Sequence, residues 1–189
     1  MGSDLKTAAA GRNFALLGFV PDQLGAHLNS MRRRLVPECP FKSHVTVLPP
    51  RALGAPAGEL SRTLDGELSR VEPFEVELGD VQVFPASGVI YLSIETGFEA
   101  LRQLHDQLTR GEFGATETYP FHPHVTLAQE FPLEHSGELV ERASELWNSW
   151  TGQRSFELGR VSLVQGEDLS TWETVREYEF TRFRRRRTV

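Results

Sequence analysis

Two copies of one tripeptide, His44-Val45-Thr46 and His124-Val125-Thr126, stand in short apolar stretches of this chain. Stretches of this length with β-branched residues, bounded by proline, predict a short strand in each place. Side chains at positions i and i+2 of a strand point to the same face. The histidine and threonine of each copy therefore share a face, and the valine points the other way. Two such strands would line one cleft with two imidazoles and two hydroxyls.

The two copies belong to a longer internal repeat with a spacing of 80 residues. Leu78-Gly79-Asp80-Val81 and Leu158-Gly159-Arg160-Val161 are separated by the same number of residues. A lone histidine in an apolar strand is more often a hydrogen-bonded core residue than a catalyst. Two copies in matching positions of a duplicated chain favour a paired catalytic site instead.

Hydrophobic periodicity predicts the same order of strand, helix, motif strand, helix and strand in both halves of the chain. The expected strands are 13–20, 43–48, 74–84, 89–95, 123–128, 155–164 and 172–180, and the expected helices are 21–35, 58–71, 98–108 and 133–150. Residues 51–57 and 109–123 are expected to be loops. This order predicts an α+β fold of two pseudo-symmetric lobes, each an antiparallel or mixed sheet with outer helices, around a central cleft.

The same pattern divides the chain into three segments. We expect a flexible leader at 1–12, a single bilobal catalytic domain at 13–181 and an Arg-rich tail at 182–189. The first lobe should span about 13–86 and the second about 87–181. The tail is interpreted as a solvated end, with an electrostatic tether for RNA as the alternative.

The paired motif resembles the 2H phosphoesterase superfamily, in particular the bacterial 2′-5′ RNA ligase-like proteins and RNA 2′,3′-cyclic phosphodiesterases. That family carries two His-x-Thr/Ser motifs, one per lobe, and His44, Thr46, His124 and Thr126 match it residue by residue. The resemblance implies a phosphodiesterase that needs no metal and opens 2′,3′-cyclic phosphates of RNA ends or nucleotides to 2′-phosphates. It also implies His124 as the base and His44 as the acid of ring opening.

The residue types suit this chemistry. Imidazoles move protons near neutral pH, and hydrolysis of a phosphodiester needs one proton taken from water and one given to the leaving oxygen. The two threonine hydroxyls can donate to non-bridging phosphate oxygens. Two histidines without nearby carboxylates make a poor metal site, so we expect no metal and no cofactor.

Other activities stay open from the sequence. The site could cleave other small 2′-5′ linked or cyclic oligonucleotides, or run in reverse as a 2′-5′ RNA ligase. A protein of a different class, a nucleotide-binding module without catalysis, would not need both histidines and both threonines.

Residues that flank the motifs are candidates for substrate binding. Arg51 follows the first motif and either reaches a phosphate or lies in a solvated loop. Tyr119 and Phe121 precede the second motif and either stack on a base or pack their loop on the core. Many family members carry a basic residue soon after the second motif, where this chain has Gln129-Glu130. The remaining histidines are expected in a loop beside the second motif (His122) or at the surface (His27, His105 and His135).

Composition and charge narrow the class of protein further. The chain has 189 residues, a net charge of −6 and 39% hydrophobic residues, as expected for a soluble globular protein. Because the tail is strongly basic, the rest of the chain is acidic and suits RNA ends or small nucleotides better than long nucleic acid. A single cysteine, Cys39, indicates a reducing compartment, which we take to be the cytoplasm. No apolar run approaches the ~20 residues of a membrane span. We expect the protein to be a monomer.

Overall fold

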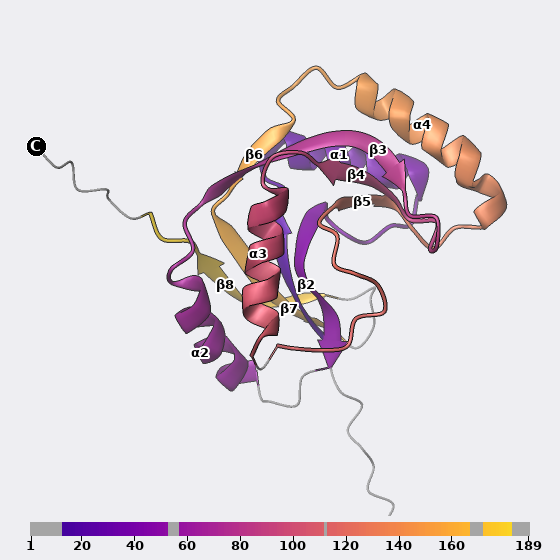
Figure 1. Cartoon of the computed structure of the whole chain (residues 1–189). Coiled ribbons are helices and arrows are strands. Elements are labelled where there is room, and N and C mark those ends of the chain that lie inside the picture. Colours follow the sequence, from indigo (N-terminus) through magenta and orange to yellow (C-terminus); the bar gives the residue numbers. More distant parts are fainter. Residues whose placement is uncertain (1–12, 53–56, 112, 167–171, 183–189) are drawn as a thin grey trace, which may run out of the picture.

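The computed structural model describes residues 13–52, 57–111, 113–166 and 172–182, so the expected leader and nearly all of the Arg-rich tail lie outside the described residues. Within these ranges the elements follow the predicted order (Figure 1). The helices are α1 (Asp22–Leu35), α2 (Ala57–Leu68), α3 (Phe98–Thr109) and α4 (Ser136–Asn148), the last preceded by a 3₁₀ turn, η1 (Leu133–His135). The strands are β1 (Asn13–Phe19), β2 (His44–Ala52), β3 (Phe74–Val83), β4 (Ile90–Ile94), β5 (Val125–Ala128), β6 (Ser155–Leu158), β7 (Arg160–Gly166) and β8 (Glu173–Glu179).

All eight strands join one curled antiparallel sheet in the order β6-β3-β4-β5-β2-β1-β7-β8. The two motif strands, β2 and β5, are central neighbours, and their one registered pair is Val45 with Val125. These residues are 80 apart in the chain, so the pair lies on the pseudo-two-fold axis of the repeat. Reading outward from it, β5-β4-β3-β6 mirrors β2-β1-β7-β8. The predicted α+β fold with two pseudo-symmetric halves is confirmed.

The two halves of the sheet do not correspond to the two sequence segments on either side of the lobe boundary expected near residue 86. β3 precedes that boundary but pairs with β4 and β6, and β7 and β8 follow it but extend from β1. A tight turn explains the first case, because the amide of Phe84 donates to the carbonyl of Val89 at 3.0 Å and Gly88 adopts a positive φ of 72°. Such a turn joins β3 to β4 as a hairpin. Each half of the sheet is therefore built from both halves of the sequence.

Two strand boundaries differ from the predictions. The strand expected at 155–164 is two strands separated by Gly159, because β6 pairs at one edge of the sheet and β7 at the other. β2 runs on through Pro49-Pro50 to Ala52, although we expected those prolines to end it. The register of β1 with β2 shifts between Phe14 and Leu16, and such a bulge accommodates residues that cannot donate a ladder hydrogen bond.

Two helices, α1 and α3, each pack on the half of the sheet opposite to the strand that precedes them. α1 packs on β5 and against α4, while α3 packs on β2 and α2 on β8 (Figure 1). Their buried faces follow the predicted spacing of leucines and of Met31: in α1 these are Leu24, Leu28, Met31 and Leu35, and in α3 they are Leu101, Leu104 and Leu108. No helix in the described ranges is long and apolar enough to cross a membrane.

Truncation of a buried leucine beside the central strand pair should weaken the fold. Leu127 in β5 is 0% exposed, so Leu127→Ala should lower the free energy of unfolding by about 2–5 kcal/mol in urea titrations. Leu133→Ala is the matched control, since Leu133 is 68% exposed and should change stability by less than about 0.5 kcal/mol. Equal losses in the two variants would contradict this packing.

Candidate active site

The four motif side chains gather on one face at the centre of the sheet. Val45 pairs with Val125 in an antiparallel register, and continuing that register sets His44 opposite Thr126 and Thr46 opposite His124. All four side chains line one cavity of about 780 Å³, while both valines are 0% exposed. The shared-face prediction from the sequence therefore describes the geometry that the structure has.

Both motif histidines are held by the same backbone contact. Nδ1 of His44 lies 2.7 Å from the carbonyl oxygen of Lys42, and Nδ1 of His124 lies 2.7 Å from that of His122. A carbonyl only accepts, so each Nδ1 carries the hydrogen and donates it. Each neutral ring is thereby fixed in one tautomer with Nε2 as its free, basic nitrogen.

The environment lowers the pKa of both motif histidines. Burial lowers the pKa of His44 to about 4; the hydrogen bond to Lys42 opposes this, and the charges of Arg32 and His124 add to it. Burial also lowers the pKa of His124, against the hydrogen bond to His122. Both rings are therefore mainly neutral at pH 7.

Aromatic rings supply part of this burial. Phe84 and Tyr91 stack with their centroids 4.0 Å apart, and each meets the ring of His124 edge to face, at 5.0 and 5.3 Å. Phe19 meets the ring of His44 in the same way at 6.1 Å. His122, which we expected in a loop beside the second motif, does lie there, edge-on to Phe84 at 5.4 Å.

Arg32 is a cavity residue that the sequence analysis did not single out. It is one of three arginines in the last turn of α1, where cations suit the helix dipole, yet Arg32 is only 2% exposed and lines the cavity. Its guanidinium donates to the carbonyl of Thr126 and, at 3.2 Å, to Sγ of Cys39. A signal was present, because Arg32 follows Leu28 by four residues and so lies on the buried face of the helix.

Arg51 is not the solvated loop residue that was one of our two alternatives. It lies in β2 with its side chain 5% exposed and donates from Nε to the carbonyl of Pro49 at 3.0 Å. Its other two nitrogens donate to the carbonyl of Phe113 and, at 2.6 Å, to a carboxylate oxygen of Glu117. Arg51 thus holds the loop before the second motif, and a contact with phosphate stays a prediction.

His105 completes this network, although we expected it at the surface. It is 5% exposed, with Nδ1 2.8 Å from the carbonyl of Val47 and Nε2 3.4 Å from Glu117. Phe121 stacks on the His105 ring at 3.7 Å, which favours the loop-packing interpretation of Phe121. Tyr119 lines the same cavity and is 58% exposed, so its ring is open to a ligand.

The other two histidines lie away from the cavity. His135 is exposed in η1, as expected. The surface prediction for His27 is wrong, because its ring is half-buried and stacks on Trp150 at 4.4 Å. Among the residues that the structure describes, no three His, Cys, Asp or Glu side chains are grouped so that they could hold a metal ion.

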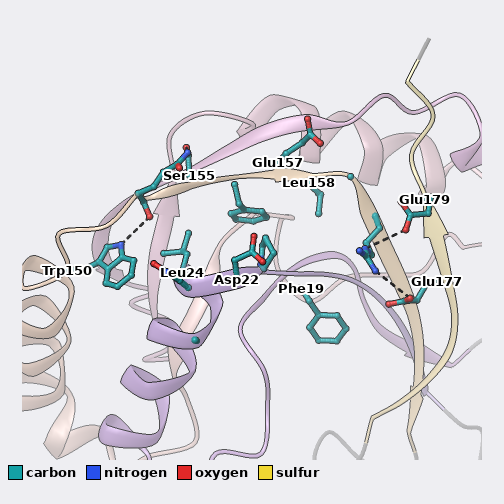
Figure 2. Close-up of a pocket in the computed structure, with 16 residues that line it drawn as sticks. Phe19, Asp22, Leu24, Trp150, Ser155, Glu157, Leu158, Glu177 and Glu179 are labelled. Carbon is teal, nitrogen blue, oxygen red and sulfur yellow. Dashed lines mark hydrogen bonds and ion pairs between the residues drawn. The ribbon is translucent and has the colours of Figure 1, made fainter. Parts of the chain in front are cut away.

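A second, larger cavity of about 1160 Å³ lies between β6, the start of α1 and the β7–β8 edge (Figure 2). Its acidic lining residues are Asp22, Glu157, Glu177 and Glu179, and its arginine, Arg160, lies 3.7 Å from both Glu177 and Glu179. An anionic phosphodiester would be repelled by this lining. The cavity with the two motifs is therefore the better candidate despite its smaller volume.

This chain is similar to proteins of a known family over most of its length. A family model described as the 2′-5′ RNA ligase superfamily matches residues 20–169. A protein of Oceanobacillus iheyensis named as a candidate phosphoesterase is 32% identical over 158 residues, or 70% of this chain and 89% of that protein. One of the same name from Halalkalibacterium halodurans is 28% identical over 176 residues, 78% of this chain and 98% of its own.

Solved structures share the fold. The crystal structure of Escherichia coli LigT with NADP⁺ has a TM-score of 0.61 and 19% identity, and the match covers 92% of this chain and 100% of that one. The LigT structure with 3′-AMP has a TM-score of 0.58 and the same identity, covering 91% and 99%. A further crystal structure, titled a phosphoesterase, has a TM-score of 0.61 with 18% identity and covers 91% and 99%.

The low pKa of His44 makes stability depend on pH. Its folded value of about 4 lies below the ordinary 6.5, so its contribution is complete above pH 6.5 and is lost as pH falls towards 4. At ~1.4 kcal/mol per pKa unit, the wild type should lose up to about 3 kcal/mol more than His44→Gln between pH 7 and 4. Urea titrations at several pH values measure this, with the exposed His135→Gln as control. A parallel loss in all three proteins would contradict the burial of His44.

Proposed function

The chain belongs to the 2′-5′ RNA ligase superfamily, and from that premise we propose that it hydrolyses 2′,3′-cyclic phosphates of RNA ends or nucleotides to 2′-phosphates. The observation that carries the proposal is the matched pair of imidazoles in one cavity. Both are fixed through Nδ1 by a carbonyl two residues earlier, so that Nε2 carries no proton in either neutral ring. Nothing in a purely structural role requires the two contacts to be alike.

The reaction needs one neutral and one protonated imidazole at the same time. Nε2 of the neutral ring takes a proton from water as the water oxygen attacks phosphorus. The bond from phosphorus to the 3′ oxygen breaks, and that oxygen takes the proton from Nε2 of the other ring. Thr46 and Thr126 donate from their hydroxyls to the non-bridging oxygens and stabilise the charge that develops there. The product is a 2′-phosphate with a free 3′ hydroxyl.

The size and lining of the cavity support a small substrate. About 780 Å³ is within the usual range for a site that takes one small molecule. Tyr119 offers an exposed ring on which a base can stack. Arg51 is already paired with Glu117, and Gln129 lines the cavity where many relatives carry a basic residue. The LigT structures with 3′-AMP and with phosphate are consistent with nucleotide binding in this fold.

The scarcity of free cations also favours a second candidate, the cleavage of other small 2′-5′ linked or cyclic oligonucleotides. A long RNA gains affinity by neutralising phosphates along its backbone, which this cavity does little to provide. Ligation to a 2′-5′ bond is the reverse of the same proton transfers. Water at its ordinary concentration favours hydrolysis over ligation.

Removal of either imidazole should abolish most of the activity. His44→Ala and His124→Ala should each lower kcat by about 10²–10⁴-fold, which is the usual contribution of a positioned acid or base. The double variant should lose much less than the product of the two losses, because the residues act as one unit. Thr46→Ala and Thr126→Ala should lose less than either histidine variant, since they leave the proton transfers intact. Steady-state kinetics on variants with unchanged circular dichroism measure these values.

Near wild-type turnover in both histidine variants would rule out the proposed mechanism. Binding of nucleotides without turnover of any phosphodiester by the wild-type protein would instead support the non-catalytic binding module.

A screen of phosphodiesters identifies the substrate and the bond that breaks. We expect turnover of nucleoside 2′,3′-cyclic phosphates, with the phosphate assigned to the 2′ oxygen by phosphorus NMR. Turnover should persist in EDTA, because the scheme requires no metal. The second candidate would be favoured by faster cleavage of 2′-5′ linked dinucleotides or cyclic dinucleotides. Activity that EDTA abolishes and zinc or manganese restores would contradict the metal-independent scheme.

A further inference from the structure

The cavity has an apolar wall on the β1 side of the first motif that the proposed proton transfers do not use. Ala15, Leu17 and Trp172 line this cavity together with the motif residues. Ala15 and Leu17 form, with Val164, a hydrophobic cluster separate from the main core, and the partly buried Trp172 packs against it. Leu17 lies opposite Thr46 in the pairing of β1 with β2, so its side chain shares a face of the sheet with the motif side chains. The apolar cluster therefore extends the floor of the cavity from the first motif towards Trp172.

The pseudo-two-fold axis shows what the equivalent place holds in the other half of the sheet. Tyr91 lies opposite Thr126, which makes it the equivalent of Leu17 in that pairing. The ring of Phe84 stacks on Tyr91 with the centroids 4.0 Å apart and meets His124 edge to face at 5.0 Å. Phe84 also lines the cavity. The second motif thus has an aromatic side chain on its outer side, supported by the strand next to it.

Trp172 supplies an aromatic ring on the corresponding side of the first motif. It comes from the segment directly before β8, packs against the apolar cluster and lines the cavity. A tryptophan has few rotatable bonds and loses little entropy when a ligand contacts it. Stacking on such a ring accepts any nucleobase, because every base has a π-face. Trp172 is therefore suited to binding a base.

Tyr119 reaches the same cavity from a different element, the loop that leads into β5. That loop is held through Glu117, whose carboxylate lies 2.6 Å from Arg51. Trp172 belongs instead to the β1–β7 part of the sheet, since the cluster on which it packs comes from those two strands. The cavity therefore offers rings from two separate elements, and a substrate with a single base can occupy only one of them.

On the basis of the proposed function, we propose that Trp172 is a substrate-binding residue that stacks on a second nucleobase, so that the site prefers phosphodiesters carrying two bases. Tyr119 stacks on the base of the nucleoside whose phosphate reacts, and Trp172 stacks on the base of the neighbouring nucleoside. Because both contacts are made to the faces of the bases, the preference is for two bases of any identity. An RNA end of at least two nucleotides and a 2′-5′ linked dinucleotide share this chemistry.

A comparison of one-base with two-base substrates tests this preference. In the wild type, a dinucleotide that ends in a 2′,3′-cyclic phosphate should have a kcat/KM about 5- to 150-fold higher than a nucleoside 2′,3′-cyclic phosphate, the usual effect of one stacked base. Trp172→Ala should remove this difference, mainly through KM, because the stack forms on binding and persists during the reaction. Its retained turnover of the single nucleotide shows that the variant is folded. Trp172→Phe should keep most of the difference, and Tyr119→Ala should lower kcat/KM for both substrates. A 2′-5′ linked dinucleotide, measured in the same variants, shows which two-base substrate uses Trp172.

Tryptophan fluorescence separates binding from catalysis. Titration with the product, a dinucleotide ending in a 2′-phosphate, should quench the fluorescence of the wild type. Trp172→Phe should lose this quenching while keeping activity. Trp150→Phe is the matched control and should keep the quenching, because Trp150 lines the other, acidic cavity.

The outcomes for the subsite and for the proposed function are distinct. Equal kcat/KM for the two cyclic phosphates in the wild type, or an equal loss on both in Trp172→Ala, would overturn the second subsite and leave the two-histidine function in place. If Trp172→Ala does not fold, quenching that persists in Trp172→Phe would overturn the subsite instead. A wild-type protein that turns over no phosphodiester would contradict the proposed function, and the fluorescence titration would still decide whether Trp172 binds a base.

Discussion

The antiparallel pairing of Val45 with Val125 is the constraint on which the rest of the site depends. Both valines are fully buried, so a slip of one residue would turn all four motif side chains into the core and the valines out of it. Close to this pair, side chains from two helices contact backbone carbonyls of the motif strands. Arg32 from α1 donates to Thr126, and His105 from α3 contacts Val47. Each half of the chain thus braces the motif strand of the other.

The part of the fold that sequence could predict is the part that local periodicity controls. Period two places a histidine and a threonine on one face, and the 80-residue repeat gives the order of elements in each half. Neither signal reports the partner of a strand. The first copy of the Leu-Gly-x-Val repeat lies within β3, but the second copy spans the end of β6, Gly159 and the start of β7. A tight turn ties β3 to β4, and β7 joins β1 instead. The exchange of strands between the halves follows from connections and not from patterns within the strands.

At the site, the contacts of the buried polar residues could not be predicted from the sequence either. Periodicity marks Arg32 as buried, but a long side chain can end several ångströms from its own helix, so the cavity it lines could not be inferred. Arg51 looked like a loop residue because Pro49-Pro50 usually ends a strand, and the bulge in β1 that tolerates them depends on a different segment. Glu117 and His105 could not be singled out from the sequence, because their partners Arg51 and Phe121 come close to them only in the folded chain.

A duplicated scaffold and acid–base chemistry place opposite demands on this cavity. Duplication tends to make the two imidazoles equivalent, and the matched contacts to Lys42 and His122 do so. Proton transfer in one direction requires them to differ, with one ring neutral while the other is charged. Arg32 lines this cavity without a carboxylate partner among the described residues, and a buried charge of that kind costs stability. On the proposed function, the matched elements hold the phosphate between the two rings, and the difference in protonation between the rings sets the direction in which the proton moves.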